Sequence, residues 1–164
     1  MTDFTARDFR EISEGKLEVL TKLKVSEKQQ DLGGSFAASV AEWKDAHPDD
    51  ILGVCFFQAE RPVGLVLLKR PPLSPPWVPL PAISLHGLKI AQTDQGKGLG
   101  KRAFGLSVAF AKNNWPEATT LTLAVDAGND PALAVYRGFG MSDSGPVFQG
   151  RIGLEHRLEL KLRS

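Results

Sequence analysis

The feature that most constrains this chain is a short glycine-rich segment between a strand-like and a helix-like pattern. The segment consists of Gln95, Gly96, Lys97, Gly98, Leu99 and Gly100. Residues 82–90 before it alternate in polarity, as a β-strand does. After it, apolar residues recur every three or four positions from Leu99 to Phe110, which predicts an amphipathic helix that stops at residues 113–116. The chain is therefore predicted to run strand, tight loop and helix at this point.

This loop has the properties of an anion-binding site. Its glycines lack a Cβ, so their backbone N–H groups can approach a ligand closely. The positive end of the helix dipole and the charges of Lys97, Lys101 and Arg102 add attraction for a phosphate. We expect the loop to hold a pyrophosphate; a surface turn that is merely rich in glycine is the plainer alternative.

Two other phosphate-binding motifs fit the segment less well. A Walker A loop needs a glycine where the chain has Gln95 and a hydroxyl residue where it has Arg102. The dinucleotide fingerprint G-x-G-x-x-A is satisfied from Gly98 to Ala103. However, only one clear strand–helix–strand crossover lies downstream, so half of the expected nucleotide fold would be missing. Dinucleotide binding is kept as the weaker alternative.

The segments before the loop predict helices and a hairpin. Leucines and aromatic residues at helical spacing over residues 16–45 predict two helices, the second interrupted near Gly33–Gly34. Residues 51–57 and 62–68 form a predicted β-hairpin. Residues 71–81 contain six of the eleven prolines, which predicts a stiff connection outside the sheet, with Trp77 leaning over a substrate cleft.

The side chains of the strand before the loop are predicted to lie on two opposite faces of the sheet. Strict alternation places Ile83, Leu85 and Gly87 on one face. The other face would carry Ser84, His86, Leu88 and Ile90.

After the loop and its helix, residues 119–125 read as a strand, so the two strands and the helix form a parallel crossover. Asp130 is the expected N-cap of a short helix over residues 132–139, and Gly140 its stop. Leucines at residues 154–162 mark a last strand. The pattern predicts a single α/β (α+β) domain over residues 1–164.

Composition excludes several classes of protein. Twenty basic and nineteen acidic residues give a net charge of +1, too little for a broad nucleic-acid surface. The single cysteine, Cys55, permits neither an internal disulfide nor a thiolate metal cluster. No apolar run approaches the roughly 20 residues that a membrane span needs, and no signal-peptide pattern is present. We expect a cytoplasmic protein with no metal, nucleic-acid or membrane partner.

Two motifs together resemble those of the GNAT superfamily of N-acetyltransferases. Residues 95–100 match its Q/R-x-x-G-x-G/A signature, and Leu88-Lys89-Ile90 stands where that family has a strand end. Residues 129–141 look like its N-x-x-A-x-x-L-Y-x-x-x-G-F motif, with Val135 for leucine and Met141 for the final phenylalanine. The resemblance covers residues 51–141. It implies a mixed, mostly antiparallel twisted sheet of about seven strands flanked by helices, with a central splayed βαβ site for acyl-CoA.

The resemblance also implies the co-substrate, acetyl-CoA, and the residues that bind it. Backbone groups near Ile90 would pair with pantetheine, and those of residues 95–101 with the pyrophosphate. The implied cofactor-binding residues are Leu88, Lys89, Ile90, Gln95, Gly96, Lys97, Gly98, Leu99, Gly100, Lys101, Asn129, Ala132 and Tyr136.

In the resembling enzymes, the position of Tyr136 protonates the departing thiolate of coenzyme A. A phenol with a pKa of about 10 is protonated at neutral pH and suits that role. Many of these enzymes use a glutamate base at the position of Ser84, which lacks a carboxylate. His86 on the same face is the first choice of base, through water, although a simple hydrogen bond across the sheet explains it equally well.

The expected reaction is direct transfer of the acetyl group from acetyl-CoA to a primary amine in a ternary complex. A non-catalytic acyl-CoA-binding module is the alternative, because of Ser84. Residues 23–30 resemble a segment of bacterial spermine/spermidine acetyltransferases, and Glu11, Glu14 and Glu27 could meet a cationic amine, although a solvated helix face explains these charges as well. Polyamines, antibiotic amines, amino acids and protein N-termini all stay open as acceptors, as does a homodimer.

Overall fold

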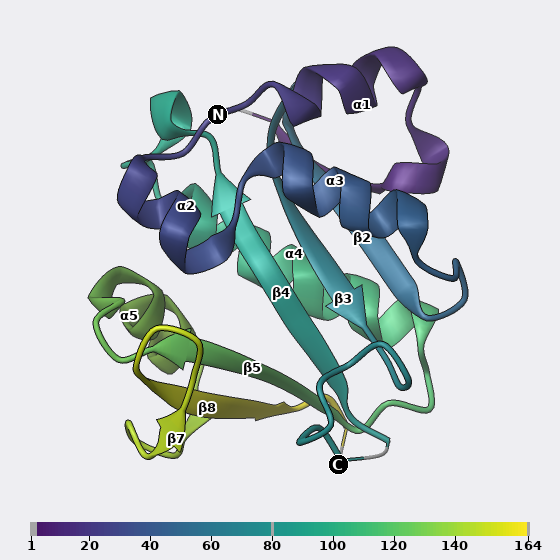
Figure 1. Ribbon diagram of the computed structural model, residues 1–164. Coiled ribbons are helices and arrows are strands. Elements are labelled where there is room, and N and C mark those ends of the chain that lie inside the picture. The colour runs from purple at the N-terminus through teal and green to yellow at the C-terminus, as the bar shows by residue number, and fades with distance from the viewer. Residues whose placement is uncertain (1–2, 80, 164) are drawn as a thin grey trace.

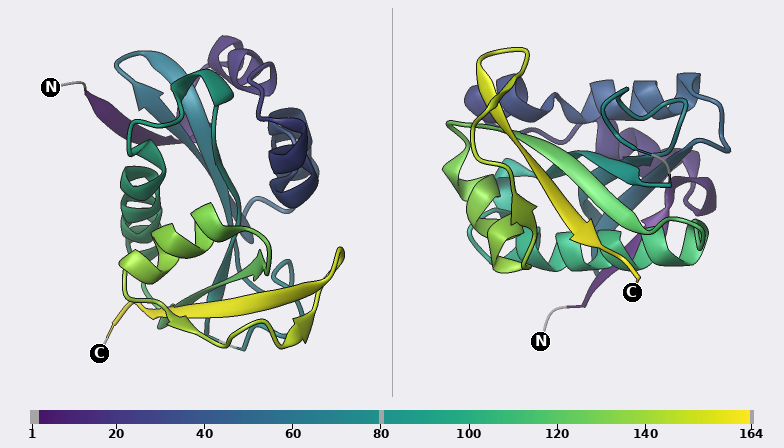
Figure 2. Two further views of the ribbon diagram at one scale, coloured as in Figure 1. Left: turned by 90° about the vertical axis from the view of Figure 1, so that its left-hand side faces the viewer. Right: turned by 90° about the horizontal axis from the view of Figure 1, so that it is seen from below.

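The computed structural model describes residues 3–79 and 81–163, which form one twisted sheet with helices on both faces (Figures 1 and 2). The strand order is β1-β2-β3-β4-β5-β8-β6, with β7 also paired to β8. Only β4 and β5 run parallel; the other neighbours are antiparallel. The strands are β1 (Phe4–Asp8), β2 (Ile51–Gln58), β3 (Arg61–Lys69), β4 (Ile83–Ile90), β5 (Thr120–Asp126), β6 (Ser142–Asp143), β7 (Phe148–Gln149) and β8 (Leu154–Lys161).

The helices divide between the two faces of the sheet. Helices α1 (Glu14–Thr21), α2 (Glu27–Gly33) and α3 (Phe36–Asp45) cover one face, and α4 (Leu99–Asn114) and α5 (Asp130–Gly138) cover the other (Figures 1 and 2). Two short 3₁₀ helices, η1 (Phe9–Glu11) and η2 (Gln92–Asp94), connect strands to helices. Each face has its own apolar core, because the central strands β2 and β3 are buried on both sides. The predicted fold class, a mixed and mostly antiparallel sheet flanked by helices, is confirmed.

The N-terminal helices differ in number from the prediction. Three helices replace the expected two, because serines at residues 13, 26 and 35 each cap a helix N-terminus. Ser26 forms a reciprocal capping box with Gln29, which starts a helix that the apolar spacing alone did not separate. Gly34, at a φ of 79°, ends α2 close to the predicted interruption.

The face assignment on β4 is wrong beyond Gly87. A register shift opposite Leu65 and Leu67 inserts a bulge, and Gly87 there has a φ of 63°. The extra residue turns Leu88 and Ile90 onto the face of Ile83 and Leu85, where they contact the same core. Lys89 consequently joins the face of His86, under α3.

Three short strands were not predicted from the sequence. β1 carries buried residues only at its two ends, and β6 and β7 have two residues each. Within the described residues, no helix combines the length and the apolar character that a bilayer span requires.

Candidate active site

The site begins where β4 and β5 part. They pair only at Ile83–Leu121 and Ser84–Thr122, and the Thr122 hydroxyl donates a hydrogen bond to the Ile83 carbonyl at 3.0 Å. Beyond this point the strands diverge (Figure 1), and a cavity of about 860 Å³ lies between them. A space of this size suits an elongated, cofactor-sized ligand.

The glycine loop forms one end of this cavity. Gly96 and Gly98 have φ angles of 82° and 75°, a left-handed conformation that side chains with a Cβ rarely adopt. Gly98 is the N-cap residue of α4, and a Cβ placed on Gly96, Gly98 or Gly100 would meet open space. The N–H groups of the first turn of α4 have no intrahelical acceptor, and this turn begins at the cavity.

Two side-chain contacts that the sequence analysis missed hold this loop. Arg61 on β3 donates two hydrogen bonds to Asp94, at 3.0 and 2.9 Å, and lowers the pKa of that carboxyl group. The Gln95 side chain donates to the Ile90 carbonyl at 2.8 Å and also bonds to Gln29. The two contacts join β3, the end of β4 and α2 to the loop.

Tyr136 reaches the cavity from α5 on the opposite wall. The α5 N-cap is Asn129 rather than the predicted Asp130, because the Asn129 side chain accepts the Ala132 N–H at 3.4 Å. The Tyr136 ring is 7% exposed and packs edge-on against Phe104, with 5.1 Å between centroids. Burial raises the pKa of Tyr136, so the phenol is protonated at neutral pH.

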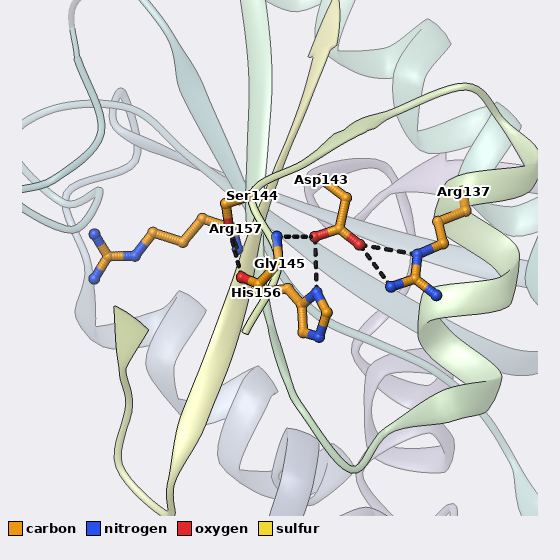
Figure 3. Close-up of polar contacts among 6 residues, drawn as sticks. All are labelled: Arg137, Asp143, Ser144, Gly145, His156 and Arg157. Atoms are coloured by element: carbon orange, nitrogen blue, oxygen red, sulfur yellow. Dashed lines mark hydrogen bonds and ion pairs between the residues drawn. The ribbon is translucent and has the colours of Figure 1, made fainter. Parts of the chain in front are cut away.

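A polar network ties the end of α5 to the last strands (Figure 3). Arg137, next to Tyr136, donates to Asp143 at 2.9 Å, and His156 Nδ1 lies 2.7 Å from the same carboxylate. Burial would raise the pKa of Asp143, but hydrogen bonds from the Gly145 N–H, His156 and Arg137 outweigh it and hold the pKa at about 2. The network therefore fixes the helix turn that carries Tyr136 against β6 and β8.

Residues 17–141 match the family model described as the acetyltransferase (GNAT) family. This match covers well over half of the chain. The chain belongs to this family. The predicted acetyltransferase is thereby confirmed at the level of the enzyme family. Among the residues that the structure describes, the sheet has no second parallel crossover of the kind that a dinucleotide-binding fold needs.

Solved GNAT structures share the fold of this chain at low sequence identity. One is a spermidine N-acetyltransferase from Vibrio cholerae in complex with CoA and spermine, with 17% identity, a TM-score of 0.73 and coverage of 97% of this chain and 95% of that one. An aminoglycoside acetyltransferase in complex with coenzyme A has 18% identity, a TM-score of 0.73 and coverage of 97% and 95%. The GNAT domain of S. lividans PAT has 16% identity, a TM-score of 0.72 and coverage of 95% and 89%. No curated protein sequence matches the chain.

The GNAT cavity gathers nearly all the residues that the sequence singled out. Ser84, His86, Asn129, Ala132 and Tyr136 line it together with residues 88–90, and so do the loop residues except Lys97. Lys97 lies 3.7 Å from Asp94 instead, and Lys101 is exposed outside the cavity wall. Trp77 of the proline-rich connection also lines the cavity, as expected.

Two titratable side chains of β4 face the part of the cavity under α2 and α3. His86 Nε2 is 2.6 Å from the Ser84 hydroxyl, and burial together with the charge of Lys69 lowers its pKa from 6.5 to about 3. Lys89 is buried, and desolvation lowers its pKa to about 8 against the opposing attraction of Glu42. The imidazole is therefore neutral at physiological pH, and the amine is largely protonated.

Proposed function

We propose that this chain transfers the acetyl group of acetyl-CoA directly to a primary amine. The observation that carries the proposal is the shared cavity: the glycine loop, the diverging end of β4 and Tyr136 all line it. The loop supplies N–H groups for a pyrophosphate, and the gap between β4 and β5 supplies a slot for an extended arm. A cytoplasmic location and a small-molecule acceptor belong to the same proposal.

Different residues of the cavity bind different parts of acetyl-CoA. Residues 95–101 hold the pyrophosphate through backbone N–H groups, while Lys97 and Lys101 add attraction from outside the cavity wall. Backbone groups of residues 88–90, which lie beyond the last residues of β4 that pair with β5, bind pantetheine and polarise the thioester carbonyl. Asn129 and Ala132 position the start of α5 beside the arm.

The acetyl transfer then requires a general acid for the sulfur and a path for the proton that the amine loses. The acceptor nitrogen attacks the thioester carbon, a C–N bond forms and the C–S bond breaks. Tyr136 gives its phenolic proton to the sulfur, which leaves as the thiol of coenzyme A. The proton lost by the amine passes through water to His86, whose neutral imidazole Ser84 orients, and returns from there to the tyrosinate.

A non-catalytic acyl-CoA-binding module is the second candidate. One observation favours it: the strand position that carries a glutamate base in resembling enzymes is Ser84 here, and its hydroxyl is bonded to His86. Such a module would bind acetyl-CoA without consuming it in the presence of amines.

Replacement of Tyr136 by phenylalanine separates the two candidates. Thiol release from acetyl-CoA is measured with a panel of primary amines, and binding of acetyl-CoA is measured by calorimetry. We expect Y136F to lose about a hundredfold or more in kcat, because the general acid is gone, while the Kd for acetyl-CoA changes little. Phe139→Leu, a change in a partly buried ring of the same region, is the matched control for packing. Wild-type protein that binds acetyl-CoA but acetylates no amine would establish the binding module instead.

A further inference from the structure

The side chain of Lys89 has no role in the proposed binding of acetyl-CoA. The bulge at Gly87 turns this side chain to the α3 face of β4, where it is 8% exposed and lines the cavity. Its Nζ would lie only 3.1 Å from a Cβ built on Gly87, so the amine folds back over the bulge. Pantetheine binding requires only the backbone of this residue.

The Lys89 ammonium is poorly satisfied within the protein. It donates one hydrogen bond, to the Ser39 hydroxyl at 2.8 Å, and lies 5.7 Å from the Phe36 ring centroid. An ammonium group has three N–H donors, and a buried charge without a counter-ion is costly. Among residues 3–79 and 81–163, no carboxylate forms an ion pair with Lys89, whereas neighbouring Lys69 is paired with Glu42. The site has the charge and the free donors to receive an anion.

The charges of the cavity are separated between its walls. On the side of β3, β4 and α3, the cavity is lined by Lys69, Lys89 and Glu42, with a net charge of +1. On the side of β5 and β8, it is lined by Asp126, Glu155 and Arg151, with a net charge of −1. A molecule that carries both an amine and a carboxylate would match this separation. A polyamine, which is cationic at both ends, would bring a second positive charge towards Lys89.

The acidic residues that suggested a polyamine lie elsewhere. Glu11, Glu14 and Glu27 are exposed, and none of them lines the cavity. They therefore provide no counter-charge for an acceptor in this site.

We propose that Lys89 and Ser39 form a binding site for a carboxylate group of the acceptor, so that the preferred acceptor is an aminocarboxylate, such as a free amino acid. This inference rests on the proposed acetyltransferase function. The carboxylate receives a charge-assisted hydrogen bond from Lys89 and a hydrogen bond from the Ser39 hydroxyl, with the amine directed away from α3.

Matched pairs of acceptors test this site. Each amino acid is compared with the amine left when its carboxylate is removed: glycine with methylamine, β-alanine with ethylamine, and lysine with cadaverine. Binding to the CoA-loaded protein is measured by calorimetry, and acetylation by thiol release. The variants are Lys89→Met, which keeps the chain length and removes the charge, Lys89→Arg, which keeps the charge, and Lys44→Met on the exposed face of α3 as the control.

The expected result is at least one pair in which the aminocarboxylate binds about tenfold more tightly than its amine. That preference should disappear in K89M and persist in K89R and K44M. Equal or tighter binding of the amines, no binding of any aminocarboxylate at millimolar levels, or a preference that survives in K89M would overturn the inference. If amines are acetylated without this preference, the acetyltransferase function stands and only the carboxylate site fails; if nothing is acetylated although acetyl-CoA binds, the function fails.

Discussion

The Ser84 hydroxyl and His86 Nε2 lie 2.6 Å apart, at the point where β4 and β5 cease to pair. The resemblance to the GNAT superfamily implies a glutamate base at the position of Ser84 in many of those enzymes. Since the His86 pKa is lowered to about 3, its imidazole is neutral throughout the physiological range. It is a weak base, which suits a relay through water better than full removal of a proton from an ammonium group.

His86→Gln should lower kcat by about tenfold to a hundredfold and leave acetyl-CoA affinity unchanged. The wild-type profile of kcat/KM against pH should have no inflection near 6.5, because the imidazole does not titrate there. Activity should instead rise with deprotonation of the acceptor amine. Steady-state rates between pH 5 and 10 provide the test. An inflection near 6.5 that vanishes in H86Q would show that His86 titrates normally.

Lys89→Met should stabilise the ligand-free protein at neutral pH. The Lys89 pKa is about 8 in the folded protein and 10.5 when unperturbed, so the unfolded chain binds more protons between these values. Burial of the charged Lys89 ammonium therefore lowers the free energy of unfolding by its full amount below pH 8. This destabilisation decreases as the pH rises from 8 to 10.5. We expect a gain of roughly 1–3 kcal/mol at pH 7, reduced by the lost bond to Ser39, from urea unfolding. A variant less stable than wild type at pH 7 would mean that the ammonium is already well compensated.

Asp143→Asn should act on Tyr136 through Arg137 and α5. The carboxylate is bonded to Arg137, His156 and the Gly145 N–H, and its loss should cost about 1–2 kcal/mol of stability at pH 7. The pKa of Asp143 is about 2 in the folded protein, below the unperturbed 3.8. The stabilisation that the ionised carboxylate contributes is therefore complete above pH 3.8 and is lost as the pH falls through 2.

The same variant should lower kcat more than it raises the Kd for acetyl-CoA, because the network positions the acid rather than the loop. Asp45→Asn, an exposed change at the end of α3, is the control. Equal kcat in D143N and wild type would show that α5 needs no support from β6 and β8.

Gly98→Ala should weaken binding of acetyl-CoA. Alanine at a φ of 75° costs about 1–2 kcal/mol, and relief of this strain would move the first turn of α4. Gly128→Ala, at a position with open space and no left-handed φ, should have little effect. Calorimetric titration of both variants compares them directly; equal loss of affinity in the two would exclude a specific role for the loop conformation.

The sequence predicted those parts of the fold whose signals are local. The hairpin of β2 and β3 follows from two short apolar runs separated by a turn. The start of α4 follows from helical periodicity and from glycine placement. β1 was missed because three of its five residues are only partly buried, which weakens any alternation. The residues of β4 after Gly87 were assigned to the wrong face because strict alternation assumes a regular strand. The bulge at Gly87 adds one residue to β4 and reverses the alternation beyond it.

The same distinction between local and non-local signals applies to the residues of the candidate site. The loop and Tyr136 were predicted through motifs, and the structure brings them to one cavity. Arg61 and Asp94, which brace the loop, are 33 positions apart and carry no local pattern. The exposure of the Lys89 amine to the cavity depends on the bulge and on α3 together, so no spacing rule could reveal it.

Calorimetric titration of the purified protein with acetyl-CoA tests whether the glycine loop binds the pyrophosphate of coenzyme A. We predict saturable binding of one equivalent, with affinity that falls as salt is raised, because the pyrophosphate is held by N–H groups and nearby lysines. Desulfo-coenzyme A should compete for the same site, and NAD should not. Absence of any saturable heat with acetyl-CoA at millimolar levels would contradict binding of acetyl-CoA at this loop.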